Sequence, residues 1–339
     1  RLRHNFTFPV HLLPVINSFL EENHRVHGHG MIFCVRVIIL LVNGEDVMIA
    51  SGRESRGNSS PLFACGNYRF DFSKRTHIMG IVNITPDSFS DGGKYLNHNC
   101  ALDHALRLVE EGVDIIGVGG ESTRPGAEPV SLEEERRRVL PVIVQIAQKV
   151  YVPVSVDNTK VALARAALEA GAVMINDISS FRFEPEMACL AAEFKVPVIL
   201  MHMRGNPQTM QNQVVYDTLI SEIFDFLKER IGFAESAGIN SHQIIIDPGI
   251  GFGKSLPDGN LTIIKHLAAL KPLGKPIMVG LSRKAFIGHV LNLGVEEREE
   301  GTAAALSVAV HNGARMVRVH DVKKMKRVVA MVDAIVAVN

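Results

Sequence analysis

Two basic residues near the end of the chain, Arg318 and His320, are separated by a single valine. In an extended strand this spacing places both side chains on the same face. Two neighbouring cations favour an oxyanion, and a guanidinium offers it paired donors. Thr123 and Arg124 carry the same chemistry in a second segment. We call these four residues the anion group and predict a local site for an anion with phosphate-type oxygens, with pairing of Arg318 to Asp321 as the competing structural explanation.

A second set of polar residues suits a flat, nitrogen-rich ring. A carboxylate binds an amino-pyrimidine edge through two parallel hydrogen bonds, and amides add donors and acceptors. We call this set the ring-binding group: Asp157, Asn176, Asp247 and Lys284. Asp247 begins the run Asp247-Pro-Gly-Ile-Gly-Phe-Gly-Lys254, whose glycines allow backbone to approach a ligand closely. The run lacks the GxxxxGK[ST] frame and therefore predicts no nucleotide site.

Two further segments have the composition of loops that close over a ligand, because they are rich in hydroxyls, glycine and proline. They are Asn83-Ile-Thr-Pro-Asp-Ser-Phe-Ser-Asp-Gly-Gly93 and Gly119-Gly-Glu-Ser-Thr-Arg-Pro-Gly126. The same composition is typical of ordinary surface turns. Their interpretation as active-site loops therefore depends on the elements that surround them.

Short apolar runs alternate with helical stretches eight times from about residue 77 onward, which is typical of parallel βα units. Eight units of this size predict an α/β fold, a (β/α)8 TIM barrel. The expected strands are His77–Asn83, Asp114–Gly119, Pro153–Asp157, Ala172–Asn176, Pro197–His202, Gln243–Asp247, Pro276–Leu281 and Arg315–His320. The expected helices lie at about 99–112, 131–150, 160–170, 185–194, 216–237, 261–271, 284–312 with an interruption, and 322–337. A doubly wound open sheet is the alternative, but it usually carries a Gly-rich turn after its first strand.

A polar residue stands at or just beyond the end of every expected strand. In a barrel these ends converge on one rim, where such enzymes have their active sites. A single such residue is commonly a helix cap or turn former, but eight together predict a polar pocket at the C-terminal mouth. The eight are Asn83, Glu121, Asp157, Asn176, His202, Asp247, Ser282 and His320.

The composition excludes several other classes of function. The 36 Lys and Arg residues balance 36 Asp and Glu residues, so no global field attracts nucleic acid. The longest apolar stretch, residues 31–42, is shorter than the roughly 20 residues of a spanning helix and lies too far from the terminus for a secretory signal. Four cysteines without CxxC spacing favour a soluble protein of the reducing cytoplasm.

Residues 1–61 look like a separate N-terminal extension, followed by a barrel domain over residues 62–339. The first 72 residues contain seven Arg and no Lys, whereas the remainder contains fifteen Arg and fourteen Lys. The turn signal Asn43-Gly44 between apolar stretches predicts a hairpin in the extension. The histidines upstream of it favour a loosely ordered arm over a metal site, which is conceivable from His27 and His29.

Eight motifs, in order along the chain, resemble the dihydropteroate synthase family of pterin-binding barrels. The resemblance covers about residues 62–338. The motifs are Met79-Gly-Ile-Val-Asn-Ile-Thr-Pro-Asp-Ser-Phe-Ser-Asp-Gly-Gly93, Val118-Gly-Gly-Glu-Ser-Thr-Arg-Pro-Gly126, Val154-Ser-Val-Asp157, Ile175-Asn-Asp177, Leu200-Met-His-Met203, Asp247-Pro-Gly-Ile-Gly-Phe-Gly-Lys254, Ser282-Arg-Lys284 and Arg318-Val-His-Asp-Val322.

The resemblance implies an enzyme that joins (7,8-dihydropterin-6-yl)methyl diphosphate to 4-aminobenzoate, releasing diphosphate and 7,8-dihydropteroate in folate synthesis. It implies that Asn83 holds Mg²⁺, that the anion group contacts the diphosphate and that the ring-binding group holds the pterin. It further implies a homodimer and inhibition by sulfonamides. The residues expected to border the aminobenzoate are Phe89, Pro125, Phe252 and Ser282, and the expected catalytic residues are Asp157, Asp247, Lys284 and Arg318.

Gly117 departs from this resemblance, because the family commonly has Asp at that position; Asn158, where Thr is frequent, is a milder change. One alternative is a pterin-binding methyltransferase relative, which would not need the Thr-Pro-Asp-Ser-Phe-Ser-Asp loop or the Arg-Val-His segment that are present here. A second alternative, a pterin-binding paralogue without catalytic activity, is kept open by Gly117 and by the N-terminal extension.

Overall fold

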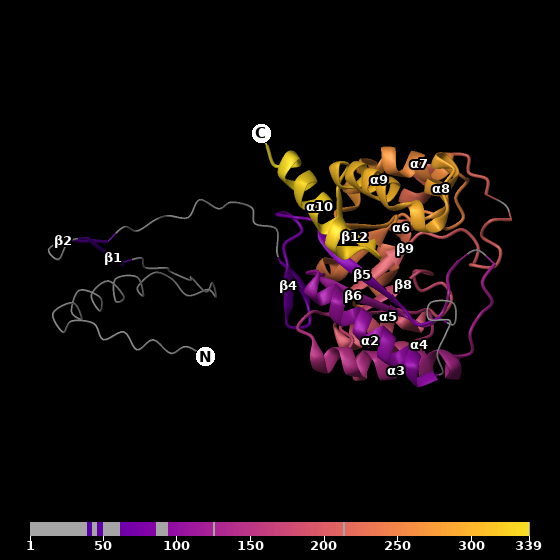
Figure 1. Cartoon of the computed structure of the whole chain (residues 1–339), viewed down its shortest axis with the longest axis horizontal. Helices are drawn as coiled ribbons and strands as arrows, with labels where there is room; N and C mark the ends of the chain where they lie inside the picture. Colours follow the sequence, from indigo (N-terminus) through magenta and orange to yellow (C-terminus); the bar gives the residue numbers. More distant parts are fainter. Residues whose placement is uncertain are drawn as a thin grey trace. The chain divides into compact units, whose positions relative to one another are not determined.

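The computed structural model describes residues 62–85, 94–124, 126–212 and 214–338, with backbone alone for 39–42, 46–49 and 94–97. The chain divides into two units, Arg1–Ser59 and Ser60–Asn339. In the first unit, β1 (Ile39–Val42) pairs antiparallel with β2 (Asp46–Ile49), on either side of the predicted turn (Figure 1). The other residues of the predicted extension, including its histidines, lie outside the described part of the chain.

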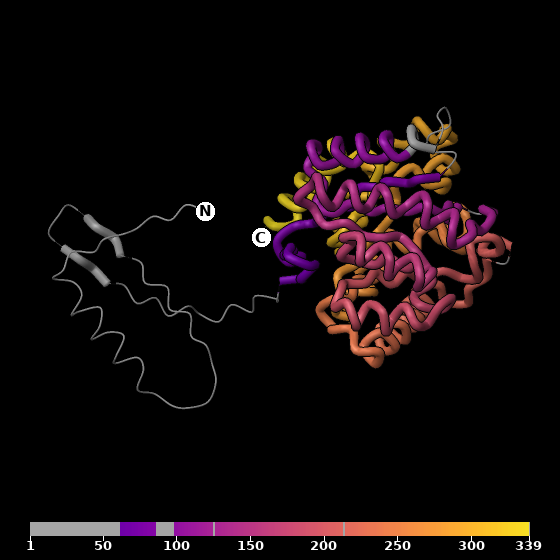
Figure 2. Tube along the Cα trace, turned by 90° about the horizontal axis from the view of Figure 1, so that it is seen from below, coloured from indigo at the N-terminus to yellow at the C-terminus, as the bar shows by residue number. Residues whose placement is uncertain are grey.

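The second unit is the predicted barrel. Eight parallel strands close in the order β10-β11-β12-β5-β6-β7-β8-β9, with helices around them (Figures 1 and 2). Each of the eight expected strands is found, with its limits shifted by at most two residues. Their bounds are β5 His77–Asn83, β6 Ile115–Gly119, β7 Val154–Asp157, β8 Met174–Asp177, β9 Val198–Met201, β10 Ile244–Asp247, β11 Ile277–Gly280 and β12 Ala314–Val319.

The helices follow the strands as expected, and the stretch predicted to be interrupted is broken into three pieces. None of the described helices is long and apolar enough to cross a membrane. The helices are α2 Lys94–Glu110, α3 Leu132–Lys149, α4 Val161–Glu169, α5 Glu186–Phe194, α6 Leu219–Ser236, α7 Asp258–Lys265, α8 Ala285–Leu291, α9 Glu299–His311 and α10 Val322–Val336, with short 3-10 helices η3 Ser241–Gln243, η4 Leu267–Leu273 and η5 Val295–Glu297.

Strand alternation divides the buried side chains between two cores. Successive side chains of a strand point to opposite faces, so the outward residues of the barrel pack against the helices and the inward residues fill its interior. On β7, for example, Val154 and Val156 belong to the helix-facing core, whereas Ser155 and Asp157 have the opposite parity. This alternation decides which polar residues can reach a central site.

A hairpin that the sequence pattern did not predict closes the N-terminal end of the barrel. It consists of β3 (Phe63–Cys65) and β4 (Tyr68–Phe70), which pair antiparallel. Its buried side chains Phe63, Cys65 and Phe70 share one apolar cluster with residues from the first half of seven barrel strands: Met79, Ile115, Met174, Ile199, Ile245, Met278 and Met316. The barrel is therefore solid at this end, and a ligand can enter its interior through the mouth.

Candidate active site

Asp157 links two strands that lie on different sides of the mouth. Its Oδ1 accepts a hydrogen bond from Asn176 Nδ2 at 3.0 Å, and its Oδ2 accepts one from Arg318 Nη2 at 2.5 Å. Two buried polar atoms of the same cluster, Asn176 Oδ1 and Arg318 Nε, have no hydrogen-bond partner among the described residues. Because burying an unpaired polar atom is costly, these two atoms point to a polar ligand in the interior.

Asp247 ends β10 and is almost fully buried. Its Oδ1 accepts a hydrogen bond from the backbone N–H of Gly249 at 2.7 Å. Burial raises the pKa of Asp247, while the positive charges of Lys284, Lys254 and Arg318 oppose that rise. Burial outweighs these neighbouring charges, so the pKa of Asp247 is raised overall.

Lys284 faces the same interior from the start of α8. Its ammonium donates to the carbonyl of Ile250 and lies 4.5 Å from the centroid of the Phe252 ring. Burial lowers the pKa of Lys284 to about 8, against the opposing charge of Asp247. Lys284 therefore lies between the Gly-rich turn and the buried carboxylate of Asp247, and its ammonium loses its proton more readily than that of an exposed lysine.

His320 lies beside Ser282, with its Nδ1 2.9 Å from the Ser282 hydroxyl oxygen. Burial lowers the pKa of His320 to about 4, and the positive charges of Arg318, Arg283, His104 and Arg124 contribute further. The imidazole is therefore neutral at physiological pH. The same convergence of positive charges makes this part of the mouth attractive to an anion.

The competing explanation for Arg318 is wrong. Asp321 forms its ion pair with Arg283, whose Nη2 lies 3.1 Å from Asp321 Oδ2. Arg318 extends instead to Asp157, 161 positions earlier in the chain. Arg318 therefore belongs to the interior of the barrel rather than to a local surface pair.

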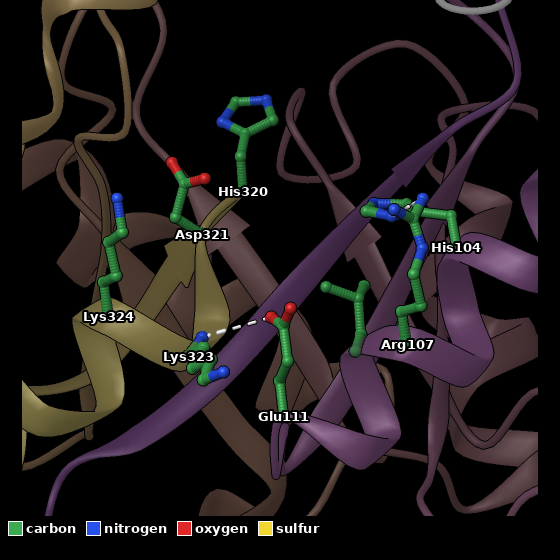
Figure 3. A pocket seen from close by; sticks show the side chains of 8 residues that line it. His104, Arg107, Glu111, His320, Asp321, Lys323 and Lys324 are labelled. Atoms are coloured by element: carbon green, nitrogen blue, oxygen red, sulfur yellow. Dashed lines mark hydrogen bonds between the residues drawn. The ribbon is translucent and has the colours of Figure 1, made fainter.

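A cavity of about 260 Å³ lies next to this region, between α2 and the start of α10 (Figure 3). Its lining is largely charged, and His320 is its only member from the anion group and the ring-binding group. Glu111 accepts a hydrogen bond from the backbone N–H of Lys323 at 3.1 Å across it. We place the candidate site at the converging strand ends instead, because the unpartnered polar atoms and the buried carboxylates lie there. The cavity is lined by His104, Arg107, Leu108, Glu111, His320, Asp321, Lys323 and Lys324.

The remaining predicted residues are described in part. Asn83 ends β5 and is half-buried, and Thr123 is half-buried in the loop after β6, where Arg124 is exposed. Phe252 is partly buried against a methionine cluster beside the mouth. Phe89, Pro125 and the rest of the segment 86–93 lie outside the described residues.

Residues 79–320 match the sequence profile of a family described as "Pterin binding enzyme". The chain is 48% identical over 276 residues to a dihydropteroate synthase of Synechocystis, covering 81% of this chain and 95% of that protein. It is 45% identical over 273 residues to the dihydropteroate synthase of Escherichia coli, covering 80% and 95%. The chain belongs to the dihydropteroate synthase family. It is accordingly an enzyme of the transferase class with a pterin-binding barrel.

Solved structures of dihydropteroate synthases have the same fold. The Yersinia pestis enzyme in a sulfonamide complex superposes with a TM-score of 0.78 at 41% identity, covering 82% of this chain and all of that one. The Xanthomonas albilineans enzyme in complex with 7,8-dihydropteroate superposes with a TM-score of 0.74 at 41% identity, with the same coverage. These similarities confirm the TIM-barrel prediction and the predicted family.

Two of the eight strand-end residues do not face the pocket, so that part of the prediction is wrong. Glu121 pairs with Lys160, which also contacts Glu135 of α3 at 2.6 Å. His202 has the parity of the outward residues of β9, and its ring packs edge-on against Phe226 of α6 at 4.8 Å. In this dihydropteroate synthase barrel, both side chains therefore support loops and helices rather than the interior.

Gly117, where this chain departs from the resemblance, lies in the barrel interior beside Asp157. A Cβ atom on Gly117 would lie 3.2 Å from Met79 Sδ and 3.5 Å from Asp157 Oδ1. A family aspartate here would point into the interior and place a second carboxylate against Asp157. With glycine at this position, the side-chain partners of Asp157 are Arg318 and Asn176. The milder change, Asn158, is buried and donates to Glu135 Oε1 at 3.0 Å.

The donor set near the anion group can be compared with the needs of Mg²⁺. Within the described part of the chain, no group of three or more His, Cys, Asp or Glu side chains could hold a metal ion. Mg²⁺ usually keeps several waters and binds through one or two protein oxygens plus substrate phosphates. The half-buried amide of Asn83, at the mouth, fits a metal ion that arrives with a diphosphate rather than one held in a protein cage.

Proposed function

We propose that the chain condenses (7,8-dihydropterin-6-yl)methyl diphosphate with 4-aminobenzoate to 7,8-dihydropteroate and diphosphate, at the mouth described above. The observation that carries this assignment is the pair of unpartnered buried atoms, Asn176 Oδ1 and Arg318 Nε, near the buried carboxylate of Asp247 and the mostly buried carboxylate of Asp157. The amino-pyrimidine edge of a pterin supplies both donors and acceptors to such a set of side chains. Solved structures of the Xanthomonas albilineans dihydropteroate synthase contain 4-aminobenzoic acid or 7,8-dihydropteroate, which supports the same substrates here.

In this proposal the ring-binding group holds the pterin. Asp247 and Asp157 accept hydrogen bonds from the ring, Asn176 both donates and accepts, and Lys284 donates to a ring acceptor. Asp157 keeps its contact with Arg318, so the pterin side of the site and the diphosphate side share one ion pair. Phe252 and Ser282 border the aminobenzoate, together with Phe89 and Pro125.

The diphosphate occupies the side of the mouth where positive charges converge. Arg318, Arg124 and Thr123 donate to its oxygens, and neutral His320 adds one N–H donor. A metal ion held by Asn83 and the diphosphate would neutralise further charge on the leaving group when bound. The group acts by binding and orienting the diphosphate, and its cationic members stabilise the charge that this leaving group acquires.

The chemistry explains why these residue types suffice. A primary carbon that bears diphosphate beside an electron-rich dihydropterin can lose its leaving group first, placing positive charge on the ring. The carboxylates of Asp157 and Asp247 then stabilise that cation, and the site mainly supplies electrostatic stabilisation. An aniline nitrogen attacks the exocyclic carbon without prior deprotonation and releases one proton after the C–N bond has formed, so a nucleophile–base triad is unnecessary. The loops after β5 and β6 exclude water, which would otherwise capture the cation.

The proposal includes an assembly and a location. The chain forms a homodimer through the late helices of the barrel, where Val308 of α9 and Met331 and Ile335 of α10 are exposed apolar side chains. It acts in the cytoplasm, in keeping with its three described cysteines, all of which are unpaired thiols. Sulfonamides compete with 4-aminobenzoate.

A coupled assay of diphosphate release tests the function directly. Release that requires 4-aminobenzoate, with formation of 7,8-dihydropteroate, is the expected result. Release at the same rate without 4-aminobenzoate would indicate a hydrolase. Tight binding of the pterin without release of diphosphate would indicate a non-catalytic paralogue.

A further inference from the structure

Lys254, the last residue of the Gly-rich run, is fully buried, and none of the roles proposed above uses it. It follows the turn 248–253, which passes beside both Asp247 and Lys284. A lysine without solvent contact is rare in proteins unless its ammonium is paired. Its terminal nitrogen therefore requires polar partners in the interior.

The Nζ atom of Lys254 has three close polar neighbours. It lies 2.8 Å from the carbonyl oxygen of Phe252, 3.1 Å from that of Gly249 and 2.9 Å from Nδ1 of His202. An ammonium would donate to all three, and a neutral amine would donate to the two carbonyls and accept from His202. In both protonation states Lys254 holds the two carbonyls of the turn.

Burial lowers the pKa of Lys254 well below its usual value, and the negative charge of Asp247 opposes that effect. Burial and the charge of Lys254 lower the pKa of His202 to about 2, so this imidazole is neutral. The hydrogen bonds of Lys254 with the turn carbonyls are present in both of its protonation states, so its role depends on this geometry and not on its charge.

Both residues whose carbonyls Lys254 holds also contact members of the ring-binding group. The N–H of Gly249 donates to Asp247 Oδ1 at 2.7 Å, and the ring of Phe252 lies 4.5 Å from Lys284 Nζ. A shift of the turn would therefore move a hydrogen bond of the buried carboxylate and the aromatic contact of the lysine together.

The turn needs such support because its backbone is unusual. Gly249 has a φ of 70°, and a Cβ atom there would lie 1.8 Å from the carbonyl oxygen of His202. Glycines lose the most conformational freedom on ordering, so a turn built from them needs external hydrogen bonds to stay in one conformation. A second such bond comes from Tyr216, whose hydroxyl donates to the carbonyl of Gly253 at 2.6 Å.

We propose that Lys254 is a positioning residue for the substrates: from beneath the turn, it fixes the atoms that hold Asp247, Phe252 and Lys284 against the pterin and the aminobenzoate. The inference rests on the proposed function, which it deepens. It assigns to this buried side chain a role in substrate affinity in addition to stability.

The test compares Lys254→Met with a matched lysine elsewhere. Lys275 is also nearly buried and contacts Glu235 at 2.8 Å and the carbonyl of Ser241 at 2.9 Å, but it precedes β11 at the other end of the barrel. For each variant we would measure Tm, the KM values of both substrates, and the Kd of 6-hydroxymethyl-7,8-dihydropterin by calorimetry. Lys275→Met should lower Tm and leave Kd and KM within about twofold of the parent values, since no site residue depends on it.

Lys254→Met should raise the pterin Kd and the substrate KM values by about tenfold or more, as expected for the loss of two or more hydrogen bonds that position ligand-binding groups. If this variant does not fold, Tyr216→Phe provides the second measurement, with an expected rise in Kd of about fivefold. A folded Lys254→Met with parental Kd and KM would overturn the inference. If Lys254→Met cannot be purified, a parental pterin Kd in Tyr216→Phe would also overturn the inference.

These outcomes are separable from those of the proposed function. The pterin Kd is measured whether or not the parent enzyme turns over, so an inactive parent counts against the function alone. An active parent with unchanged affinity in the folded variant counts against the role of Lys254 alone.

Discussion

Arg318 on the last strand of the barrel lies 2.5 Å from Asp157 on the third, so one ion pair crosses the mouth between strands that are 161 positions apart. Both side chains are mostly buried, with 22% and 14% of their surface exposed. Arg318 belongs to the anion group and Asp157 to the ring-binding group. The pair therefore provides a direct electrostatic connection between the proposed leaving-group side of the site and the proposed pterin side.

This connection predicts the effect of Asp157→Asn, which keeps the shape of the side chain and removes its charge. The variant loses a carboxylate acceptor for the pterin and leaves the Arg318 guanidinium without its counter-charge. We expect kcat/KM to fall by about ten- to a hundredfold, as for a charged hydrogen bond. The control is Glu193→Gln, which breaks an exposed pair with Arg165 and should leave kcat/KM unchanged, because exposed pairs contribute little. Equal effects in the two variants would count against the assigned role of Asp157.

Lys284→Ala and Asp247→Ala should each nearly abolish turnover while the fold stays intact. Each removes a polar partner from the buried pterin edge, and a hydrogen bond to a charged group is worth roughly 1.5 to 3 kcal/mol, or about ten- to a hundredfold in binding. Circular dichroism and steady-state kinetics measure the two effects separately. Lys265→Ala, at an exposed position of α7, is the control with parental kinetics. Parental kcat/KM in both site variants would remove the pterin assignment.

Most of the barrel and much of the site could be predicted from the sequence, because both depend on short-range periodicity. The positions of Asp157, Asn176, Asp247 and Arg318 follow from strand ends and from the alternation of side chains. The parity of His202 also followed from that alternation, and neglecting it led to the wrong placement in the pocket. Alternation is therefore as informative as proximity to a strand end.

Other features could not be predicted because they depend on tertiary contacts. The hairpin of β3 and β4 has three residues in each strand, too few for a periodic signal. The pairing of Arg318 with Asp157, in place of the considered pairing with Asp321, could not be predicted without knowing how the strands close. The burial of Lys254 depends on the path of a turn whose glycines adopt left-handed conformations, which no side-chain pattern reports.

The pKa of Lys284 predicts a basic limb in the pH profile. Burial lowers this pKa from 10.5 to about 8, so the ammonium that we propose contacts the pterin is lost as the pH rises through about 8. We expect kcat/KM to fall above that pH. In Lys284→Arg the limb should move upward by more than a unit in pH, because a guanidinium stays protonated. A parental profile that is flat from pH 6 to 10 would contradict the assignment.

The lowered pKa of Lys284 also affects stability: its contribution to stability should rise with pH, whereas kcat/KM should fall. Between pH 8 and 10.5 the unfolded chain binds more protons at Lys284 than the folded chain does. The contribution of this residue to the free energy of unfolding therefore rises with pH across that window. Replacing Lys284 with Met should raise Tm at pH 7 while it removes activity, because the buried charge serves binding at the expense of stability.

The order of substrate binding is predicted from the loops at 84–93 and 121–127. If diphosphate and Mg²⁺ order these loops, the aminobenzoate pocket is complete only in their presence. Calorimetry should then detect little binding of 4-aminobenzoate to the free enzyme and clear binding after diphosphate is added. Sulfonamides should show the same dependence. Equal affinity with and without diphosphate would demonstrate a preformed pocket.

The last prediction is that residues 1–61 are dispensable for catalysis. All the residues assigned to the site lie between Asn83 and His320, and the barrel closes with strands that begin at His77. The hairpin that fills its N-terminal end begins at Phe63, so a chain that starts at Pro61 keeps the whole apolar cluster. We expect parental kcat and KM for this truncated chain.

A second truncated chain, which begins at Ser73, tests whether the hairpin of β3 and β4 is needed for folding. A chain that starts at Ser73 loses Phe63, Cys65 and Phe70, and thereby exposes the methionine and isoleucine side chains that they cover at the N-terminal end of the barrel. Removing a large buried aromatic side chain typically costs about 3 to 5 kcal/mol, so this chain should be unfolded or strongly destabilised while the chain from Pro61 is not. Circular dichroism, thermal unfolding and the coupled assay are run on both beside the full chain. A folded chain from Pro61 with less than about a tenth of the parent kcat, a loss of roughly 1.4 kcal/mol in transition-state stabilisation, would mean that the N-terminal extension contributes to the active site.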